Sequence, residues 1–297
     1  MLLGFKEYEA QAQHLAEALE LPYARVGVHH FPDGECKVTL PGKLPVHVVF
    51  CRSLDHPDDK LIELLLAATT ARELGAWRLT LVAPYLCYMR QDKAFAVGEA
   101  VSQSIIGRFL AGLFDDVITV DPHLHRTHHL ADAVPATHAV ALSATAVMRD
   151  FLHSYCEAHP ESHGDTILLG PDSESEQWVR SLAEAGGLAY GVACKERLGD
   201  REIRITLPDL DLSSNAVVLV DDVISSGQPI AIALEACLKR GAERVDVLVT
   251  HPLFAQGAIE RLRQAGVGEI WSTDSIPHPS NCIVLTNLIA EAVQRIV

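Results

Sequence analysis

Short apolar runs alternate with amphipathic stretches along most of the chain. Six of the runs are mostly apolar and rich in β-branched or aliphatic residues: 46–50, 77–83, 117–120, 166–169, 216–220 and 245–250. Apolar runs of this length are typical of parallel strands buried on both faces. Apolar residues at helical spacing follow several of them, as at 58–74, 102–113 and 139–156. The alternation of strand and helix predicts an α/β fold with mostly parallel sheets.

The length of 297 residues favours two domains. The order of strand, polar loop and helix occurs in both halves of the chain, although no close residue repeat is evident. We place the boundary near Leu142, which predicts an N-terminal domain at 1–142 and a C-terminal domain at 143–297. Both are expected to be α/β domains of similar architecture.

Charge and cysteine content narrow the classes of function. The formal net charge of −15 argues against a nucleic-acid partner and against binding to an anionic membrane. An anionic substrate would then need local clusters of basic residues. The seven cysteines are scattered without a CxxC pair, and no apolar run is long enough to span a membrane. We therefore expect a cytoplasmic protein with reduced thiols.

The stretch 216–240 combines the features of a ligand site. Asp221 and Asp222 follow a predicted buried strand, and a small-residue turn at 225–228 leads to Pro229, which suits the first turn of a helix. Backbone amides at a helix amino end bind anions, and paired carboxylates can hold ribose hydroxyls or a metal. These residues predict a site for a phosphorylated sugar. The alternative is an ordinary strand-to-helix turn in which the polar residues only cap the helix.

This stretch resembles the phosphoribosyl-pyrophosphate loop of type I phosphoribosyltransferases and ribose-phosphate pyrophosphokinases. The resemblance implies that Asp221 and Asp222 orient the ribose hydroxyls. It also implies that the loop binds the 5-phosphate through Ser225, Ser226, Gly227, Gln228 and Pro229. The family loop usually ends in glycine and threonine, whereas Gln228 and Pro229 stand here. Pro229 lacks an amide hydrogen and a hydroxyl, so up to two contacts of about 1.5–3 kcal/mol each are lost.

Two N-terminal segments resemble parts of the pyrophosphokinases only. The sequence Phe31-Pro32-Asp33-Gly34-Glu35 predicts a hairpin turn and, without context, a plain one. Pyrophosphokinases carry a similar loop that reaches ATP, often in a neighbouring subunit, which implies that Phe31, Asp33, Gly34 and Glu35 contact the nucleotide. The run 84–93 resembles the family's Pro-Tyr-x-x-Tyr-x-Arg-Gln-Asp motif. It implies ATP contacts for Arg90, Gln91 and Asp92, where the alternative is a solvated loop.

Metal ligands are also implied by the resemblance. Asp121 and His123 occupy the place of the family's Asp-Leu-His motif beside magnesium, with Pro122 in place of the usual aliphatic residue. The nearby His125, His128 and His129 raise the alternative of zinc, but four well-spaced ligands are missing. Asp172 matches an aspartate that accompanies a second metal, although Ser173, Glu174 and Ser175 replace a small residue and two glycines. Mg²⁺ is therefore the expected cofactor.

The charged segment 195–204 reads on its own as a solvated hairpin. Pyrophosphokinases have a Lys-x-Arg pair at the base of a mobile loop that closes over ATP, and Lys195 and Arg197 fit it. The resemblance makes both residues catalytic, with Lys195 the chief cation and Arg197 also a contact of the sugar phosphate. A cation delivered on closure stabilises charge that develops in the transition state.

The resemblance covers essentially the whole chain, in family order. It implies two phosphoribosyltransferase-like domains and transfer of diphosphate from Mg-ATP to ribose 5-phosphate, giving phosphoribosyl pyrophosphate and AMP. A homo-oligomer, a dimer or a multiple of dimers, is the expected assembly. Two alternatives stay open: a regulatory paralogue that binds nucleotide and a partner enzyme with little catalysis, and a phosphoribosyltransferase.

Overall fold

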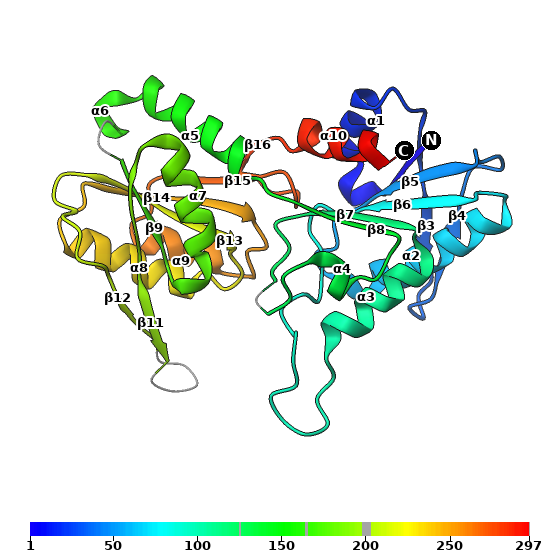
Figure 1. The fold of residues 1–297 in the computed structure, drawn as a ribbon, viewed down its shortest axis with the longest axis horizontal. Helices are drawn as coiled ribbons and strands as arrows, with labels where there is room; N and C mark the ends of the chain where they lie inside the picture. Colours follow the sequence, from blue (N-terminus) through cyan, green and yellow to red (C-terminus); the bar gives the residue numbers. More distant parts are fainter. Residues whose placement is uncertain (125, 164–165, 198–202, 297) are drawn as a thin grey trace. The chain divides into compact units, whose positions relative to one another are not determined.

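The computed structural model describes residues 1–124, 126–163, 166–197 and 203–296 (Figure 1). The chain forms two compact units. The first unit comprises Met1–Ser143, Ser275–Pro277 and Leu285–Val297, and the second comprises Ala144–Asp274 and His278–Val284. The sequence-based division placed all of 143–297 in one domain, whereas contacts assign its last helix, α10 (Thr286–Ile296), to the first unit.

The first unit is built on a sheet of six parallel strands in the order β2-β1-β5-β6-β7-β8. The strands are β1 (Leu2–Gly4), β2 (Tyr23–Arg25), β5 (His47–Cys51), β6 (Arg78–Val82), β7 (Asp116–Val120) and β8 (His138–Leu142). One face is covered by α1 (Glu9–Ala18) and α10, and the other by α2 (Pro57–Glu73), α3 (Ser102–Leu113) and α4 (Leu130–Ala133) (Figure 1). A 3₁₀ turn, η1 (Lys6–Tyr8), precedes α1.

The second unit has the same arrangement, with six parallel strands in the order β10-β9-β13-β14-β15-β16. The strands are β9 (Thr166–Gly170), β10 (Ala189–Val192), β13 (Ala216–Val223), β14 (Arg244–His251), β15 (Ile270–Thr273) and β16 (Asn281–Ile283). Helices α5 (Thr145–Ala158) and α7 (Glu176–Gly186) pack together, as do α8 (Gln228–Lys239) and α9 (Ala258–Gln264). The short elements α6 (Pro160–His163) and η2 (Ser173–Ser175) complete the unit.

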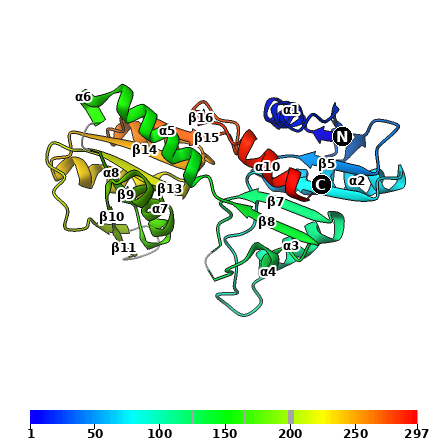
Figure 2. The same ribbon diagram turned by 45° about the horizontal axis from the view of Figure 1, so that its top comes forward.

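The two sheets follow one topology, because in each the second strand lies at the edge beside the first, and the later strands add in order on the other side. Each unit also inserts an antiparallel hairpin after its second sheet strand. The hairpins are β3 (Gly27–His30) with β4 (Cys36–Thr39), and β11 (Cys194–Arg197) with β12 (Ile203–Thr206). The predicted fold, two similar α/β domains with mostly parallel sheets, is confirmed (Figure 2).

Burial explains why the unbroken apolar runs form central strands. All five residues of β7 and of β9 are buried, and so are the first five of β13. Strands shielded on both faces have no polar face to alternate, so their sequences stay apolar throughout. Each unit has its own core, and in the first the rings of Phe50 and Phe114 meet edge to face at 5.6 Å.

One predicted element is wrong in its first part. The run 139–156 was expected to be a single helix, but His138–Leu142 forms β8 along β7, and α5 begins only at Thr145. A short stretch of alanine, valine and leucine suits either state, and here pairing with a parallel neighbour decides it. Among the described residues, no helix has both the length and the apolar character required to cross a membrane.

Candidate functional site

The predicted site residues lie where parallel strands end. In the first unit, the loop 83–101 follows β6 and the loop 121–129 follows β7, and these strands are direct neighbours. In the second unit, Asp172 follows β9, while Asp221 and Asp222 lie near the end of its neighbour β13. The carboxyl ends of adjacent parallel strands share one edge of a sheet, which is where open α/β sheets bind ligands. Each unit therefore presents one polar edge.

Three carboxylates on the polar edge of the second unit interact electrostatically. Burial raises the pKa of Asp221 well above its usual value, and the negative charges of Asp222 and Asp172 raise it further. Asp221 Oδ1 accepts a hydrogen bond from the amide of Asp222 at 3.0 Å, and Asp222 is 3% exposed. Neighbouring acids whose negative charges repel one another favour binding of a cation or of hydroxyl donors between them.

The replacement of the family's glycines by Ser173, Glu174 and Ser175 has a local structural explanation. These residues form η2, and Asp172 caps it by accepting a hydrogen bond from the amide of Glu174 at 3.0 Å. The hydroxyl of Ser175 donates to the carbonyl of Asp172 at 2.6 Å. Ser175 packs against Gly170, where any added Cβ would lie 2.2 Å from its Oγ. The turn thus holds the backbone of Asp172 without glycine.

The small-residue turn after β13 leads directly into α8. Gly227 caps the helix with a φ of +69°, a left-handed conformation that glycine adopts without strain. The hydroxyl of Ser226 accepts a hydrogen bond from the amide of Gln228 at 3.4 Å. Arg261, on α9, donates to the carbonyl of Ser226, and the amide of Ala255 donates to the carbonyl of Ser225 at 2.9 Å. The turn is therefore fastened to the segment that follows β14.

On the polar edge of the first unit, Arg90 and Asp92 differ sharply in accessibility. Arg90 is exposed, whereas the Asp92 side chain is only 2% exposed and accepts two hydrogen bonds from Arg126, at 2.7 and 3.0 Å. Tyr88, with a φ of +61°, donates its hydroxyl to Asp58 at 2.5 Å. Arg90 is thus available to a ligand, while the carboxylate of Asp92 is already engaged.

Asp121 and His123 follow β7. Asp121 is 5% exposed and has a φ of +34°, a strained conformation for a residue with a side chain. Its amide donates to the carbonyl of Leu142 at 2.8 Å. Within the described part of the chain, no three His, Cys, Asp or Glu side chains are grouped closely enough to hold a metal by themselves. His125 lies outside the described residues.

The few candidate metal ligands in the described residues fit magnesium better than zinc. Zinc sites in proteins usually take four side chains, whereas Mg²⁺ is commonly held by one or two carboxylates together with substrate phosphates and water. Repulsion from Asp222 and Asp172 contributes to the raised pKa of Asp221, and a bound divalent cation would reduce that repulsion. The donors present therefore fit magnesium that arrives with a phosphorylated substrate.

The turn between β3 and β4 is tightly hydrogen-bonded. The amide of Phe31 donates to the carbonyl of Glu35 at 2.8 Å, and the amide of Gly34 donates to the carbonyl of Phe31 at 3.0 Å. Asp33 Oδ1 accepts from the amide of Glu35 at 3.2 Å, so one of its oxygens shapes the turn. Gly34 has a φ of +94°, as this turn requires. The Phe31 ring is 41% exposed and remains available for stacking.

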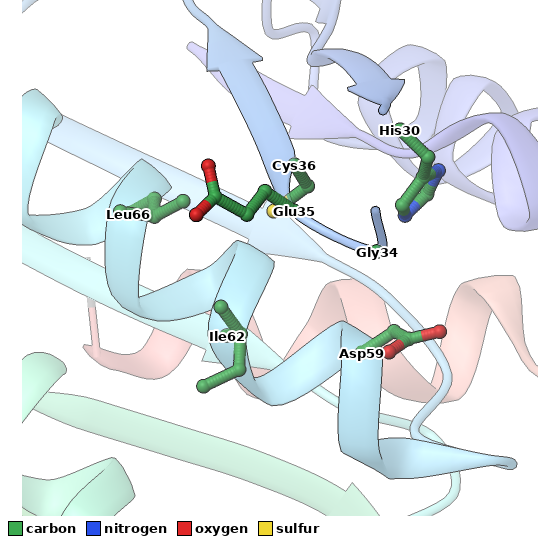
Figure 3. Close-up of a pocket in the computed structure, with 7 residues that line it drawn as sticks. All are labelled: His30, Gly34, Glu35, Cys36, Asp59, Ile62 and Leu66. Carbon is green, nitrogen blue, oxygen red and sulfur yellow. The ribbon is translucent and has the colours of Figure 1, made fainter. Parts of the chain in front are cut away.

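A pocket of about 370 Å³ lies between this turn and α2 (Figure 3). The hairpin contributes His30, Gly34, Glu35 and Cys36, and α2 contributes Asp59, Ile62 and Leu66. Sequence reasoning missed the α2 side of the pocket. A signal was present, because Ile62 and Leu66 are apolar but lie four residues apart outside the buried stripe of the helix, at 53% and 38% exposure.

A buried ionic network fixes the hairpin against α2. Glu63 accepts hydrogen bonds from His30 Nε2, at 2.8 Å, and from Arg52. Arg52 also donates to Glu7 at 2.6 Å and lies 3.9 Å from the centre of the Phe5 ring. Arg52 and Glu63 are 3% and 2% exposed. Removing one partner of such a buried pair is costly, so the network holds one wall of the pocket in place.

The structure describes only the backbone at Lys195 and Arg197. On β11 they pair with Ile205 and Ile203 of β12. Their side chains, and residues 198–202 between the two strands, lie outside what the structure describes. Their predicted catalytic role stays a prediction.

Comparison with known proteins identifies the family. Residues 1–113 match the family described as the N-terminal domain of ribose phosphate pyrophosphokinase, and residues 205–297 match the phosphoribosyl synthetase-associated domain. The ribose-phosphate pyrophosphokinase of Methanopyrus kandleri is 33% identical over 297 residues, which is 100% of this chain and 99% of that protein. The chain belongs to the ribose-phosphate pyrophosphokinase family. The resemblance inferred from the motifs is confirmed.

Other members of the family agree with this assignment. The ribose-phosphate pyrophosphokinase of Thermococcus kodakarensis is 33% identical over 277 residues, 93% of each chain. The crystal structure of phosphoribosylpyrophosphate synthetase from Mycobacterium smegmatis matches with a TM-score of 0.82 at 22% identity, over 100% of this chain and 98% of that one. At that identity the structural match supports the fold, and it extends over both units.

Proposed function

We propose that this family member is a ribose-phosphate diphosphokinase, which transfers the β,γ-diphosphoryl group of Mg-ATP to the C1 hydroxyl of ribose 5-phosphate. The observation that carries the proposal is the full-length similarity to the Methanopyrus kandleri ribose-phosphate pyrophosphokinase, which spans both units. In the reaction, the C1 hydroxyl oxygen bonds to the β-phosphorus and loses its proton. The bond from that phosphorus to the α,β-bridging oxygen breaks, and AMP leaves.

The second unit would bind ribose 5-phosphate. Asp221 and Asp222 would accept hydrogen bonds from the ribose hydroxyls. Their negative charges repel each other, and hydroxyl donors would relieve this repulsion. The turn 225–229 would bind the 5-phosphate at the amino end of α8, a helix of 12 residues. Since Pro229 offers no amide hydrogen, Ser225, Ser226 and Gln228 would supply the contacts.

The first unit would bind ATP. Arg90 is exposed and its guanidinium matches a phosphate group, and Gln91 lies beside it. At the hairpin, the exposed ring of Phe31 would stack on the base, and Asp33 and Glu35 would accept from its amino group. The ion pair of Asp92 with Arg126 favours a supporting role for Asp92 over direct contact with the nucleotide.

Mg²⁺ is the proposed cofactor: one ion would be held by His123 and Asp121 on the first unit, and Asp172 on the second unit would accompany a second ion. When bound, it would neutralise charge on the phosphate oxygens and orient the polyphosphate. Lys195, and with it Arg197, would hold the transferring diphosphoryl group, and Arg197 would also contact the sugar phosphate. Cations placed there stabilise charge that grows on the nonbridging oxygens in the transition state.

The test is formation of AMP by the purified protein with ATP, ribose 5-phosphate and magnesium. AMP that appears only when ribose 5-phosphate is present supports the proposal. A second candidate, a regulatory paralogue with little catalysis, is favoured by one observation, the replacement of a phosphate-binding residue by Pro229. Nucleotide binding without AMP formation would select it. Consumption of phosphoribosyl pyrophosphate with a purine or pyrimidine base would instead select a phosphoribosyltransferase.

We also propose a homo-oligomeric assembly and a cytoplasmic location. The oligomer follows from the family resemblance of the Phe31–Glu35 turn, which in relatives reaches a neighbouring subunit's nucleotide, and sedimentation of the active species would test it. The location is supported by the cysteines, all seven of which are free thiols, as is usual in reducing compartments.

A further inference from the structure

The loops after β6 and β7 carry the residues proposed to bind the polyphosphate and the metal. The two strands are paired in parallel, with Leu81 opposite Val117 and Val82 opposite Ile118. Neighbouring strands bring the loops to the same edge of the sheet. Strand pairing alone does not fix how one loop is oriented against the other, and this requires contacts between the loops themselves.

Gln103 makes such contacts with both loops. It is the second residue of α3, and it is 4% exposed. Its Nε2 donates to the carbonyl of Met89 at 3.1 Å, and its Oε1 accepts from the hydroxyl of Thr127 at 2.9 Å. Its backbone amide donates to the carbonyl of Gln91 at 3.1 Å, which satisfies one of the first amides of α3. Gln103 therefore binds the backbone on both sides of Arg90.

A side-chain amide is suited to this position by its chemistry. A backbone carbonyl only accepts, so the group facing Met89 must donate, while the group facing the hydroxyl of Thr127 accepts. An amide provides both from one planar group. Glutamate would place a carboxylate oxygen against the carbonyl of Met89, and an apolar side chain would remove the hydrogen bonds to this buried carbonyl and to the partly buried hydroxyl of Thr127.

Two other contacts support this region, one between the two loops and one between helices α3 and α4. Arg126, next to Thr127, donates to both carboxylate oxygens of Asp92, next to Gln91. Farther along α3, a Cβ at Gly107 would come within 1.8 Å of the carbonyl oxygen of Ala133, so α3 lies directly against the end of α4, which follows the second loop. Helix α3 is thus anchored at Gln103 to the loop that follows β7, and at Gly107 to α4, which comes directly after that loop.

We propose that Gln103 is a positioning residue that fixes the Arg90–Gln91 segment relative to His123, so that the polyphosphate contacts and the metal ligand act on one nucleotide. The inference rests on the nucleotide side of the proposed function. It assigns no contact with substrate to Gln103 itself, which acts through the backbone of its neighbours.

The experiment compares Mg-ATP binding and steady-state kinetics in Thr127→Val, Gln103→Met and the double variant. Thr127→Val keeps the shape of the side chain and removes only the hydroxyl. The Kd for Mg-ATP should rise about five-fold in Thr127→Val and about twenty-fold in Gln103→Met, for the loss of one and two hydrogen bonds. The half-saturating magnesium concentration should rise in parallel. The KM for ribose 5-phosphate should stay within about two-fold, since its contacts lie elsewhere.

The double variant and two controls make the result specific. Because Thr127 acts through Gln103, the double variant should bind Mg-ATP no more weakly than Gln103→Met alone. Thr127→Ser retains the hydroxyl and should behave like the original protein. Ser104→Ala, at the next residue of α3, removes a hydroxyl that bonds only to Val101 among the contacts described. It should leave the Kd for Mg-ATP and the KM for ribose 5-phosphate unchanged.

The outcomes separate this inference from the proposed function. An unchanged Kd in both Thr127→Val and Gln103→Met would overturn the inference, as would a lowered melting temperature with unchanged Kd, or an equal rise in the constants for both substrates. The predicted shifts in Kd without any AMP formation by the original protein would support the inference and reject the diphosphokinase reaction. Absence of Mg-ATP binding to the original protein would overturn both.

Discussion

At Asp221, the proposed role in binding ribose and the stability of the folded protein have opposite requirements. An acid whose pKa is higher in the folded than in the unfolded state binds more protons when folded, so stability falls as the pH rises from the unfolded pKa towards the folded one. Since the pKa of Asp221 is raised by burial and by Asp222 and Asp172, this residue destabilises the ligand-free protein at pH values above its unfolded pKa. Such a cost is tolerated where a bound ligand relieves it.

We predict that Asp221→Asn raises the free energy of unfolding of the ligand-free protein at pH 7 and lowers kcat/KM for ribose 5-phosphate. Loss of a charge-assisted hydrogen bond of about 1.5–3 kcal/mol corresponds to a fall of about 10- to 100-fold. Urea denaturation and AMP formation measure the two effects. The control is Asp209→Asn, which removes one charge from an exposed position of the same unit. Lower stability in Asp221→Asn would contradict the electrostatic argument.

Lys195 is the residue proposed to act mainly in the transition state. We predict that Lys195→Ala lowers kcat by about 100-fold or more, as removal of one transition-state donor does elsewhere, while the Kd for Mg-ATP changes much less. Single-turnover kinetics and calorimetry provide the two numbers. Lys239→Ala, at an exposed position of α8, is the matched control. A variant that retains full turnover would remove Lys195 from the mechanism.

Motif residues and supporting residues differ in how far the sequence could predict them. The acids after β13 and Arg90 could be placed on strand-end loops because their motifs follow apolar runs. Gln103 could not, since nothing in Ser102–Leu113 beyond an ordinary helix indicates that its second residue bonds two loops. The engagement of Asp92 by Arg126, 34 positions away, was likewise invisible, because it depends on how two loops fold back on each other.

At the scale of elements, both sheets carry a buried acid near the amino end of a central strand. On β7, Asp116 accepts from Arg78 at 2.8 and 3.0 Å, from Thr80 at 2.8 Å, and lies 2.6 Å from His138 Nδ1. On β14, Asp246 accepts from Arg244 at 2.8 and 2.9 Å and lies 2.8 Å from His163 Nε2. Each cluster ties neighbouring elements together at the edge of the sheet opposite the ligand loops.

We predict that Asp116→Asn lowers the free energy of unfolding at pH 7 by about 3 kcal/mol, the order expected when a buried ion pair loses one partner. Burial alone would raise the pKa of Asp116, but hydrogen bonds from Arg78, His138 and Thr80 outweigh it and lower the pKa. The carboxylate therefore stabilises the fold above its unfolded pKa, and this contribution is lost as the pH falls through the folded pKa. The difference between variant and original should shrink below about pH 4.

Urea denaturation at several pH values measures this dependence. Asp132→Asn, at an exposed position of α4, is the control and should leave the unfolding free energy nearly unchanged. Because Asp116 lies away from the ligand loops, kcat and both KM values of folded Asp116→Asn should equal those of the original protein. A large loss of kcat in a fully folded Asp116→Asn sample would contradict this and show that the amino end of β7 influences the candidate functional site.

Elements were predicted from the sequence where their apolar pattern is unambiguous and missed where pairing decides. The central strands β5, β6, β7, β9, β13 and β14 lie within a few residues of the apolar runs that predicted them. The sequence of β8 predicts helix instead of strand, because five residues of mixed burial carry little periodicity and only the pairing with β7 makes them a strand. The turn η2 depends on the contact of Ser175 with Gly170, which no local pattern reveals.

At the scale of the whole molecule, the chain returns to its first unit after completing the second. Helix α10 contacts α1, β7 and β8, and its buried side chains are Ile289, Ala290, Ala292 and Val293. The amphipathic pattern of this helix does not by itself show which core it joins. Its apolar face would suit either sheet, and only the long-range contacts assign it. Part of the first unit's core is therefore encoded at the far end of the chain.

We predict that Ile289→Ala destabilises the first unit by about 3 kcal/mol, within the range for a buried isoleucine replaced by alanine. Ile289 is 4% exposed. Hydrogen exchange should show lost protection in α1, β7 and β8, since these elements contact α10, while β13 and β14 keep theirs. Gln294→Ala, at an exposed position of the same helix, should leave exchange unchanged throughout. Lost protection in β13 and β14 with β7 and β8 intact would contradict the assignment of α10 to the first unit.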